Sequence, residues 1–360
     1  MRMKVTLLTA LITLGAEGAA QQPVGMMTRH YVDSARRSWD GSELRPIRTS
    51  IWYPARQGLG QQSILDASVP FTVPPVAENA PVASHALRYP LILLSHGTGG
   101  SAIQMMWLGH RLAAHGYIVA AVSHHGNTSL EPRPTPQGFL LYWERARDLD
   151  VALRSLARDS VFGTRIDTSR IGAAGFSLGG YTVLAVAGAR FNPTEYERFC
   201  ASTKRDFTCE GQAEFPQAPR LFAELRKTDT VVQASLRRAS NSYRIPSVRG
   251  VFAIAPALGG GFTRADVVDV TIPVSIVAGD GDKVAPVETN ARRFAEIIPG
   301  AELWVMSGGV GHYTFLAECT ERGIAALPAL CADAPSVNRR EVHDRVASAA
   351  LAFFDRVFHR

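Results

Sequence analysis

Short apolar runs alternate along the chain with longer segments in which apolar residues recur every three or four positions. Continuous apolar runs typical of buried strands lie at 89–95, 117–122, 170–176, 251–255, 273–278 and 303–306. Segments of helical periodicity lie at 101–115, 142–156 and 178–189, and a last one follows Asn338. Ser101 stands where it could cap the first of these helices. This alternation predicts a mainly parallel sheet with helices on both faces, so the expected fold class is α/β.

Two segments interrupt this alternation. Residues 26–88 are richer in proline, glycine and polar residues, and we expect antiparallel edge strands there, one of them over 48–53, with a surface loop. Residues 190–249 form a long insertion with one expected helix at about 220–238. We interpret the insertion as a cap over the site, and a solvated surface excursion fits the pattern equally well. Residues 21–360 are thus predicted to form one domain with a cap-like insertion.

The first twenty residues have the pattern of a secretory signal peptide. Arg2 and Lys4 precede a short apolar run at 5–14, and small residues at 18–20 offer a cleavage site before Gln21. The run is too short to span a bilayer comfortably, and no later run is long enough. We therefore expect a secreted or periplasmic protein with no transmembrane segment in the mature chain.

Composition and charge narrow the function classes. The chain is 46% apolar and 19% charged, which is ordinary for a globular protein. Its net charge of +6 is mild, and no basic stripe interleaved with aromatic residues is present, so nucleic-acid binding is not expected. Export permits disulfides. Loop-closure cost favours the two local pairings, Cys200 with Cys209 and Cys319 with Cys331.

The segment 175–179, Gly-Phe-Ser-Leu-Gly, follows an apolar strand and opens an apolar helix. A G-x-S-x-G sequence in that context is typical of a tight strand-to-helix turn that exposes the serine hydroxyl. The N-terminus of the following helix adds partial positive charge near developing negative charge. We predict Ser177 as a nucleophile.

A serine nucleophile needs a base, and the base needs an orienting acid, in the chain order Ser, Asp or Glu, His. His312 follows a strand end and a glycine-rich loop, and we predict it as the base over His343 and His359, which lie on a predicted helix. Asp280 and Asp282 both follow the strand at 273–278. We favour Asp282, which lies deeper in the loop, whereas Asp280 suits a turn.

An oxyanion hole needs two backbone N–H groups aimed at one point. One should belong to Leu178, directly after the nucleophile, and the other to the loop after the strand at 89–95. We choose Thr98 in the glycine-rich sequence 96–100 as the second donor. His96, at the start of that loop, is interpreted as structural.

The adjacent histidines His124 and His125 follow the next predicted strand. Adjacent side chains at a strand end point in different directions, and no third ligand has a telling spacing, so metal binding is disfavoured. A role in lining the pocket or fixing the loop fits better. We place His125 and Phe176 among the substrate-binding residues and expect no metal or other cofactor.

These motifs together resemble the dienelactone-hydrolase-like branch of the α/β-hydrolases, particularly the group related to platelet-activating factor acetylhydrolases. The similar segments lie at 51–55, 95–99, 124–128, 175–180, 255–257, 279–282 and 311–312. The resemblance implies an α/β-hydrolase fold, a Ser177–Asp282–His312 triad, and oxyanion amides at Thr98 and Leu178. It also implies metal-free hydrolysis of esters with short or polar acyl groups. One departure is that dienelactone hydrolases proper use a cysteine nucleophile.

The function we predict is serine-dependent cleavage of carboxylic esters through an acyl-enzyme, acting on a small-molecule ester or a lipid. The insertion carries eleven Lys and Arg against seven Asp and Glu. This excess favours anionic or zwitterionic substrates, including phospholipids. An amidase or peptidase with the same triad, a polyester depolymerase, and a binding protein on an inactive hydrolase scaffold are the alternatives.

Overall fold

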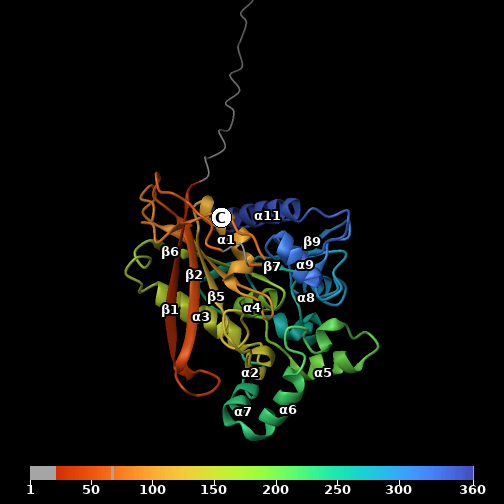
Figure 1. The fold of residues 1–360 in the computed structure, drawn as a ribbon. Coiled ribbons are helices and arrows are strands. Elements are labelled where there is room, and N and C mark those ends of the chain that lie inside the picture. Colours follow the sequence, from red (N-terminus) through yellow and green to blue (C-terminus); the bar gives the residue numbers. More distant parts are fainter. Residues whose placement is uncertain (1–21, 66–68, 360) are drawn as a thin grey trace, which may run out of the picture.

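The computed structural model describes residues 22–65 and 69–359, and the predicted signal peptide lies outside them. Its centre is a nine-stranded sheet in the order β3-β1-β2-β5-β4-β6-β7-β8-β9 (Figure 1). All strand pairs from β5 to β9 are parallel, while β2 is antiparallel to both β1 and β5. The strands are β1 Val24–Arg37, β2 Leu44–Pro54, β3 Ala77–Glu78, β4 Tyr89–Ser95, β5 Ile118–Ser123, β6 Ile166–Phe176, β7 Val248–Ile254, β8 Val274–Gly279 and β9 Glu302–Met306.

Two helical layers cover the sheet because successive side chains of a strand point to opposite faces. On β4, Leu91 and Leu93 join the apolar cluster that contains helices α3, α4 and α8. Ile92 and Leu94 join the cluster that contains α1 and α11. The helices are α1 Met106–Ala114, α2 Pro136–Leu140, α3 Glu144–Leu156, α4 Leu178–Ala187, α5 Pro193–Ala201, α6 Ala218–Thr228, α7 Thr230–Leu236, α8 Ala291–Ile297, α9 Glu321–Ala326, α10 Pro328–Cys331 and α11 Arg339–His359. This is the α/β-hydrolase fold.

The predicted strands are present, and the N-terminal segment forms the expected antiparallel edge in β1 and β2. Two helix predictions are wrong in detail. Ser101 stands at the N-cap of a 3₁₀ turn at Ala102–Met105 that leads into α1, but its side chain makes no capping hydrogen bond. The helix expected at about 220–238 is two helices, because the Asp229 carboxylate accepts hydrogen bonds from the amides of Val231 and Val232 and begins a new helix there.

The insertion contains α5, α6 and α7, which Figure 1 shows gathered at the end of the molecule away from α1 and α11. Both predicted disulfides are confirmed, with Cys200 bonded to Cys209 and Cys319 bonded to Cys331. Across the described part of the chain, no helix is both long and apolar enough to cross a membrane.

Candidate active site

Ser177 occupies the sharp turn between β6 and α4. Its φ of 56° is in the left-handed region, where a residue with a side chain is held only by its surroundings. A Cβ on Gly175 would lie 2.2 Å from the carbonyl oxygen of Gly179, so the turn closes only because that position is glycine. The amide of Ser177 donates to the carbonyl of Ile254 on β7 at 2.8 Å. These constraints fix the Ser177 hydroxyl at the carboxyl edge of the sheet.

The structure brings His312 and Asp282 to Ser177, and we call these three residues the site triad. His312 Nε2 lies 2.9 Å from Ser177 Oγ, and His312 Nδ1 lies 2.6 Å from Asp282 Oδ2. The Asp282 carboxylate can only accept, so His312 carries a proton on Nδ1 and leaves Nε2 to accept from the serine hydroxyl. This is the geometry in which an imidazole can take the serine proton.

The two candidate acids have different partners in the structure. The other oxygen of Asp282 accepts from the amides of Val284 at 2.9 Å and Ala285 at 2.7 Å, which hold the carboxylate toward His312. Asp280 instead accepts from the amides of Gly308 and Gly309 and so fastens the loop that carries His312. Asp280 is thus placed as a loop anchor and Asp282 as the partner of the imidazole.

The predicted oxyanion donors both border the same pocket as Ser177. Among the described residues, the amides of Thr98 and Leu178 donate to no protein oxygen. The next amide, that of Gly99, donates to Asn127 Oδ1 at 2.5 Å, and Asn127 Nδ2 donates to the carbonyl of Gly138 at 3.1 Å. Asn127 is fully buried and therefore fixes the loop rather than meeting a substrate.

A second serine, histidine and aspartate lie beneath that loop, and we call Ser95, His124 and Asp148 the buried triad. Ser95 Oγ lies 2.9 Å from His124 Nε2, and His124 Nδ1 lies 3.0 Å from Asp148 Oδ2. Arg145 reaches the carbonyl of His96 from the same side, and the His124 amide donates to His96 Nε2 at 3.1 Å. His96 therefore lies below the oxyanion loop with its side chain hydrogen-bonded, a position that fits the structural role predicted for it.

Charge in the buried triad is fixed by its surroundings. Burial lowers the pKa of His124 to about 3, with the Arg145 charge acting in the same direction, so the imidazole is neutral. Burial opposes ionisation of Asp148, but Arg45 and Arg36 outweigh it and hold the pKa of that carboxyl well below its usual range. Arg45 Nε donates to Asp148 at 2.9 Å and Arg36 Nη2 at 2.7 Å. The carboxylate of Asp148 is therefore buried away from solvent, and both of its oxygens accept hydrogen bonds from protein groups.

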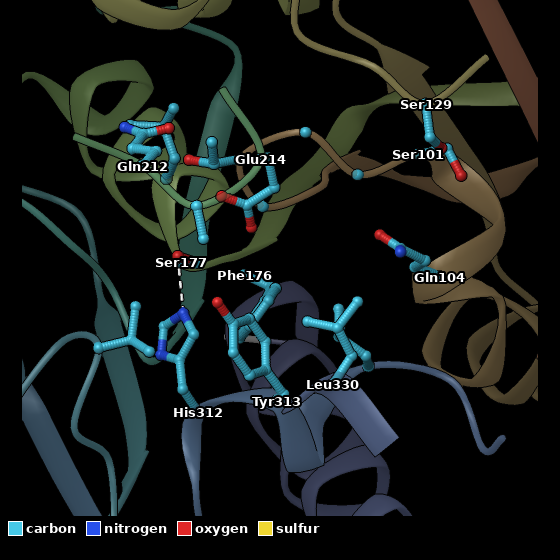
Figure 2. A pocket seen from close by; sticks show the side chains of 18 of the residues that line it. Ser101, Gln104, Ser129, Phe176, Ser177, Gln212, Glu214, His312, Tyr313 and Leu330 are labelled. Atoms are coloured by element: carbon cyan, nitrogen blue, oxygen red, sulfur yellow. Dashed lines mark hydrogen bonds between the residues drawn. The ribbon is translucent and has the colours of Figure 1, made fainter. Parts of the chain in front are cut away.

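Ser177 opens onto a cavity of about 540 Å³ whose walls are mostly apolar. Figure 2 shows Ser177 and His312 on one side of this cavity, with Phe176, Tyr313 and Leu330 around them. Apolar lining comes from six separate parts of the chain: Val69, Pro70, Phe71, Ile103, Leu130, Phe207, Leu258, Leu316, Leu327 and Leu330. A cavity of this size and polarity suits a small organic ester.

The two predicted substrate-binding residues lie in different places. Phe176 borders the cavity and packs its ring 4.8 Å from the ring of His312. His125 does not border it. Its Nε2 accepts from the Trp39 amide and its Nδ1 meets Glu131, so the side chain points into a second surface hollow. The substrate-binding prediction for His125 is not supported by this placement.

Several lining residues had no signal in the sequence. Phe207, Gln212 and Glu214 come from the insertion, and Leu327 and Leu330 come from the loop closed by the second disulfide. These residues follow no motif and no periodicity, so only the tertiary fold could reveal them. The insertion thus contributes to the wall of the pocket, as a cap would.

Comparison with known proteins agrees with this architecture. A family model described as PETase, PET hydrolase-like, matches residues 83–194, which include Thr98 and Ser177 but neither Asp282 nor His312. Cutinase est1 of Thermobifida alba is 26% identical over 215 residues, which are 59% of this chain and 49% of that protein. Cutinase est2 of the same organism is 36% identical over 104 residues, 28% of this chain and 31% of that protein. The chain thus spans about half the length, or less, of these curated relatives.

A solved structure extends the likeness of fold to nearly the whole chain. The ferulic acid esterase from Streptomyces cinnamoneus superposes with a TM-score of 0.61 at 20% sequence identity, covering 95% of this chain and 92% of that one. Similarity at this level of identity is evidence for the fold. Together with the family match over residues 83–194, it supports the α/β-hydrolase fold.

Proposed function

We propose that the protein is a serine hydrolase of carboxylic esters that works through an acyl-enzyme. The observation that carries the proposal is the hydrogen-bonded site triad, which opens onto an apolar cavity bordered by two unpaired backbone amides. The names of the curated relatives and of the structural neighbour, cutinases and a ferulic acid esterase, support the same class of reaction.

In this mechanism His312 Nε2 takes the proton from Ser177 Oγ as the oxygen attacks the ester carbonyl carbon. The amides of Thr98 and Leu178 donate hydrogen bonds to the oxyanion that forms. His312 then gives its proton to the leaving alcohol, and the acyl group stays on Ser177. Water then attacks the acyl carbon as His312 takes its proton, and His312 returns that proton to Ser177 Oγ as the acid is released. Asp282 holds the imidazole in the required tautomer and stabilises the imidazolium.

The finer assignment to the dienelactone-hydrolase-like branch is part of the proposal. Its support is the Trp-Tyr-Pro sequence at 52–54 and the loop at 124–128, in which Asn127 holds the oxyanion loop. We also infer that the protein works outside the cytoplasm, because two disulfides brace its surface loops and disulfides persist in oxidising compartments.

A polyester depolymerase is the second candidate, favoured by the family description PET hydrolase-like. The same nucleophile and oxyanion amides would serve it. Against it stands the contribution of the insertion to the pocket wall, because a polymer chain needs an open cleft. Release of soluble acids from a polyester film, compared with turnover of a small ester, separates the two.

The first experiment is hydrolysis of p-nitrophenyl esters from acetate to decanoate by the wild type and by Ser177→Ala. We expect turnover in the wild type, a maximum at short or medium chains that fit the cavity, and none above background in the variant. Matched p-nitroanilides measure the amidase alternative. Equal rates in both proteins, or no ester turnover by the wild type, would overturn the proposal.

A further inference from the structure

The insertion at 190–249 is basic overall, but the charged residue that it places at the cavity is acidic. Among the described residues that border the cavity, Glu214 is the sole carboxylate, and no lysine or arginine is present. None of the eleven Lys and Arg of the insertion borders the cavity. Five of them form ion pairs elsewhere: Arg190 with Asp269, Arg198 with Glu195, Arg205 with Glu210, Lys227 with Glu224 and Arg238 with Glu144. The expectation that the basic insertion favours anionic substrates is therefore not supported, because its positive charge does not reach the site.

Glu214 is held against the oxyanion loop by close packing. A Cβ on Gly99, whose φ is +61°, would lie 2.8 Å from Glu214 Cγ, so the segment approaches the loop as closely as glycine allows. The next residue, Phe215, packs edge to face on Phe139 with ring centroids 5.4 Å apart. Figure 2 shows the Glu214 side chain directed toward the space beside Ser177 and Tyr313.

The carboxylate also lies within electrostatic reach of the reacting groups. The side chain of Glu214 is exposed, but desolvation by the surrounding protein still raises its pKa, and a backbone hydrogen bond and the nearby His312 partly offset this rise. Burial likewise raises the pKa of Tyr313 to about 12, with added contributions from the charges of Glu214 and Asp282. The carboxylate of Glu214 interacts electrostatically with both His312 and Tyr313. It will therefore also interact with any charged group of a substrate that occupies the same space.

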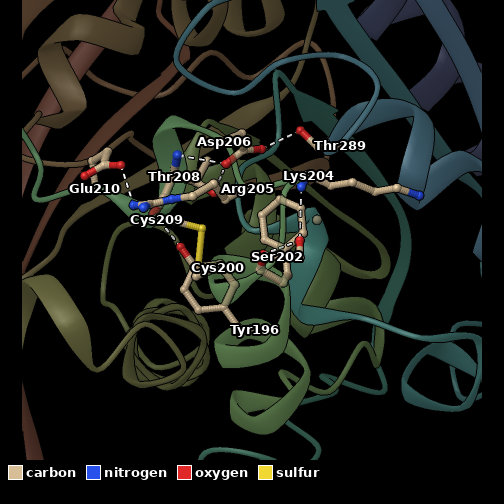
Figure 3. The surroundings of a disulfide bond; sticks show 12 residues. Tyr196, Cys200, Ser202, Lys204, Arg205, Asp206, Thr208, Cys209, Glu210 and Thr289 are labelled. Atoms are coloured by element: carbon tan, nitrogen blue, oxygen red, sulfur yellow. Dashed lines mark hydrogen bonds and ion pairs between the residues drawn. A yellow bond between two sulfur atoms is a disulfide. The ribbon is translucent and has the colours of Figure 1, made fainter.

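The segment that carries Glu214 is anchored on its N-terminal side. The Cys200–Cys209 bond closes the preceding loop, and Asp206 inside that loop contacts Thr289 and accepts from Asn290 Nδ2 at 2.8 Å (Figure 3). Three residues beyond the disulfide, Gln212 also borders the cavity, and its Oε1 is buried with no partner among the described residues. Of the described residues of the insertion that border the cavity, Glu214 therefore carries the formal charge, and none is a lysine or arginine.

We propose that Glu214 is a specificity-determining residue of this pocket, which excludes esters bearing an anionic group near the scissile bond and admits neutral or cationic ones. This inference rests on the proposed esterase activity and names its substrate class. A carboxylate or phosphate on the acyl chain would meet the like charge of Glu214 at the wall of the cavity. A hydroxyl or ammonium group there would instead find an acceptor in Glu214.

The test compares three p-nitrophenyl esters of similar length: the pentanoate, the glutarate monoester and the 4-(trimethylammonio)butanoate. Assays at pH 8 keep the carboxyl ionised, and each rate is divided by that of alkaline hydrolysis. We expect the wild type to prefer the pentanoate to the glutarate by roughly tenfold or more in kcat/KM. E214Q should raise kcat/KM for the glutarate about tenfold, leave the pentanoate within twofold, and weaken turnover of the cationic ester.

E210Q is the matched control, because Glu210 belongs to the same insertion but pairs with Arg205 and does not border the cavity. It should leave all three rates unchanged. Raising NaCl from 0.05 to 0.5 M should narrow the discrimination of the wild type and leave E214Q unaffected. Unaltered discrimination in E214Q, or none in the wild type, would overturn the inference while pentanoate turnover leaves the esterase proposal standing. Absence of pentanoate turnover, or its persistence in Ser177→Ala, would overturn both.

Discussion

The site triad and the buried triad contain the same groups at nearly the same distances, but only one of them meets a pocket. The serine oxygen lies 2.9 Å from the histidine Nε2 in both. The histidine Nδ1 lies 2.6 Å from aspartate in the site triad and 3.0 Å in the buried triad. By these distances alone, Ser95 would be as good a candidate nucleophile as Ser177.

What separates the two serines is the backbone and the surroundings. Ser177 sits on a turn with φ of 56°, borders the cavity, and is followed by the unpaired amide of Leu178. Ser95 is the last residue of a central strand and is 0% exposed. A hydrogen-bonded serine becomes a nucleophile only where a carbonyl carbon can reach it and its oxyanion finds donors. The buried triad has the same chain of hydrogen bonds, but no substrate carbonyl can reach Ser95 and, in the described part of the chain, no oxyanion donors face it. We therefore expect the buried triad to position the oxyanion loop.

The sharpest test of this contrast is covalent labelling. A fluorophosphonate probe should modify Ser177 and leave Ser95 unmodified, as read by mass spectrometry of the digested protein. Ser177→Ala should abolish labelling and lower kcat by a factor of about 10⁴ or more, because the acyl-enzyme cannot form. Modification of Ser95 in the native protein would show that the buried triad is accessible and would remove the distinction.

Replacing the aspartate of each triad with asparagine should separate effects on catalysis from effects on stability. Asp282→Asn should lower kcat by a factor of about 10⁴, because the imidazole is left in the wrong tautomer, with a small effect on the free energy of unfolding. Asp148→Asn should instead lower the free energy of unfolding by about 3–5 kcal/mol, because Arg36 and Arg45 lose a buried partner.

Urea unfolding monitored by tryptophan fluorescence measures the stability of both aspartate variants, and p-nitrophenyl butyrate measures kcat. Asp33→Asn offers a comparison for Asp148→Asn, since Asp33 also pairs with Arg36 but lies outside the buried triad. If Asp148→Asn lost activity while its stability stayed intact, a direct catalytic role would replace the positioning role.

The two triads also show how far the sequence could predict the site. Ser177 and His312 were accessible to prediction because glycine-rich sequences at strand ends impose a specific backbone, and the sheet brings those strand ends to one edge. The sequence favours Asp282 over Asp280 only by its depth in the loop, since both follow the same strand and the choice depends on which carboxylate meets Gly308 and which meets His312.

The neighbouring histidines and the insertion show where sequence patterns carry too little information. His124 and His125 are adjacent, yet one enters the buried triad and the other faces a different hollow. In the insertion, the excess of Lys and Arg concealed the carboxylate of Glu214, which borders the pocket. Net charge sums over a whole segment, whereas the pocket meets only the residues that packing turns inward, and this packing leaves no periodic trace for Glu214.

The low pKa of His124 makes a prediction about stability and pH. The pKa is about 3 in the folded protein and near 6.5 when unfolded, so the unfolded state takes up the proton first as the pH falls. Stability that is present above pH 6.5 is therefore lost progressively between pH 6.5 and about 3. At pH 5 this group should contribute a loss of about 2 kcal/mol.

Urea unfolding of the wild type and of His124→Gln at pH 7.5, 6.5 and 5 tests this linkage. The variant cannot protonate at that position, so its stability should fall less between pH 7.5 and 5, by about 2 kcal/mol. Burial also lowers the pKa of His343, to about 4, and this residue provides a second such group in both proteins. Parallel pH profiles for the two proteins would show that His124 is not the neutral buried partner that the triad requires.

The smallest expected effect is that of Ser95→Ala, and it bears most directly on the comparison. Removing the hydroxyl leaves His124 Nε2 without its donor in a buried place, which should cost about 1–2 kcal/mol of unfolding free energy. The site triad is untouched, so kcat on p-nitrophenyl butyrate should stay within about threefold of wild type. If kcat fell as far as in Ser177→Ala while the urea midpoint stayed at the wild-type value, Ser95 would take part in catalysis together with Ser177. Retained activity with the predicted loss of stability would leave access and oxyanion donors as what distinguishes them.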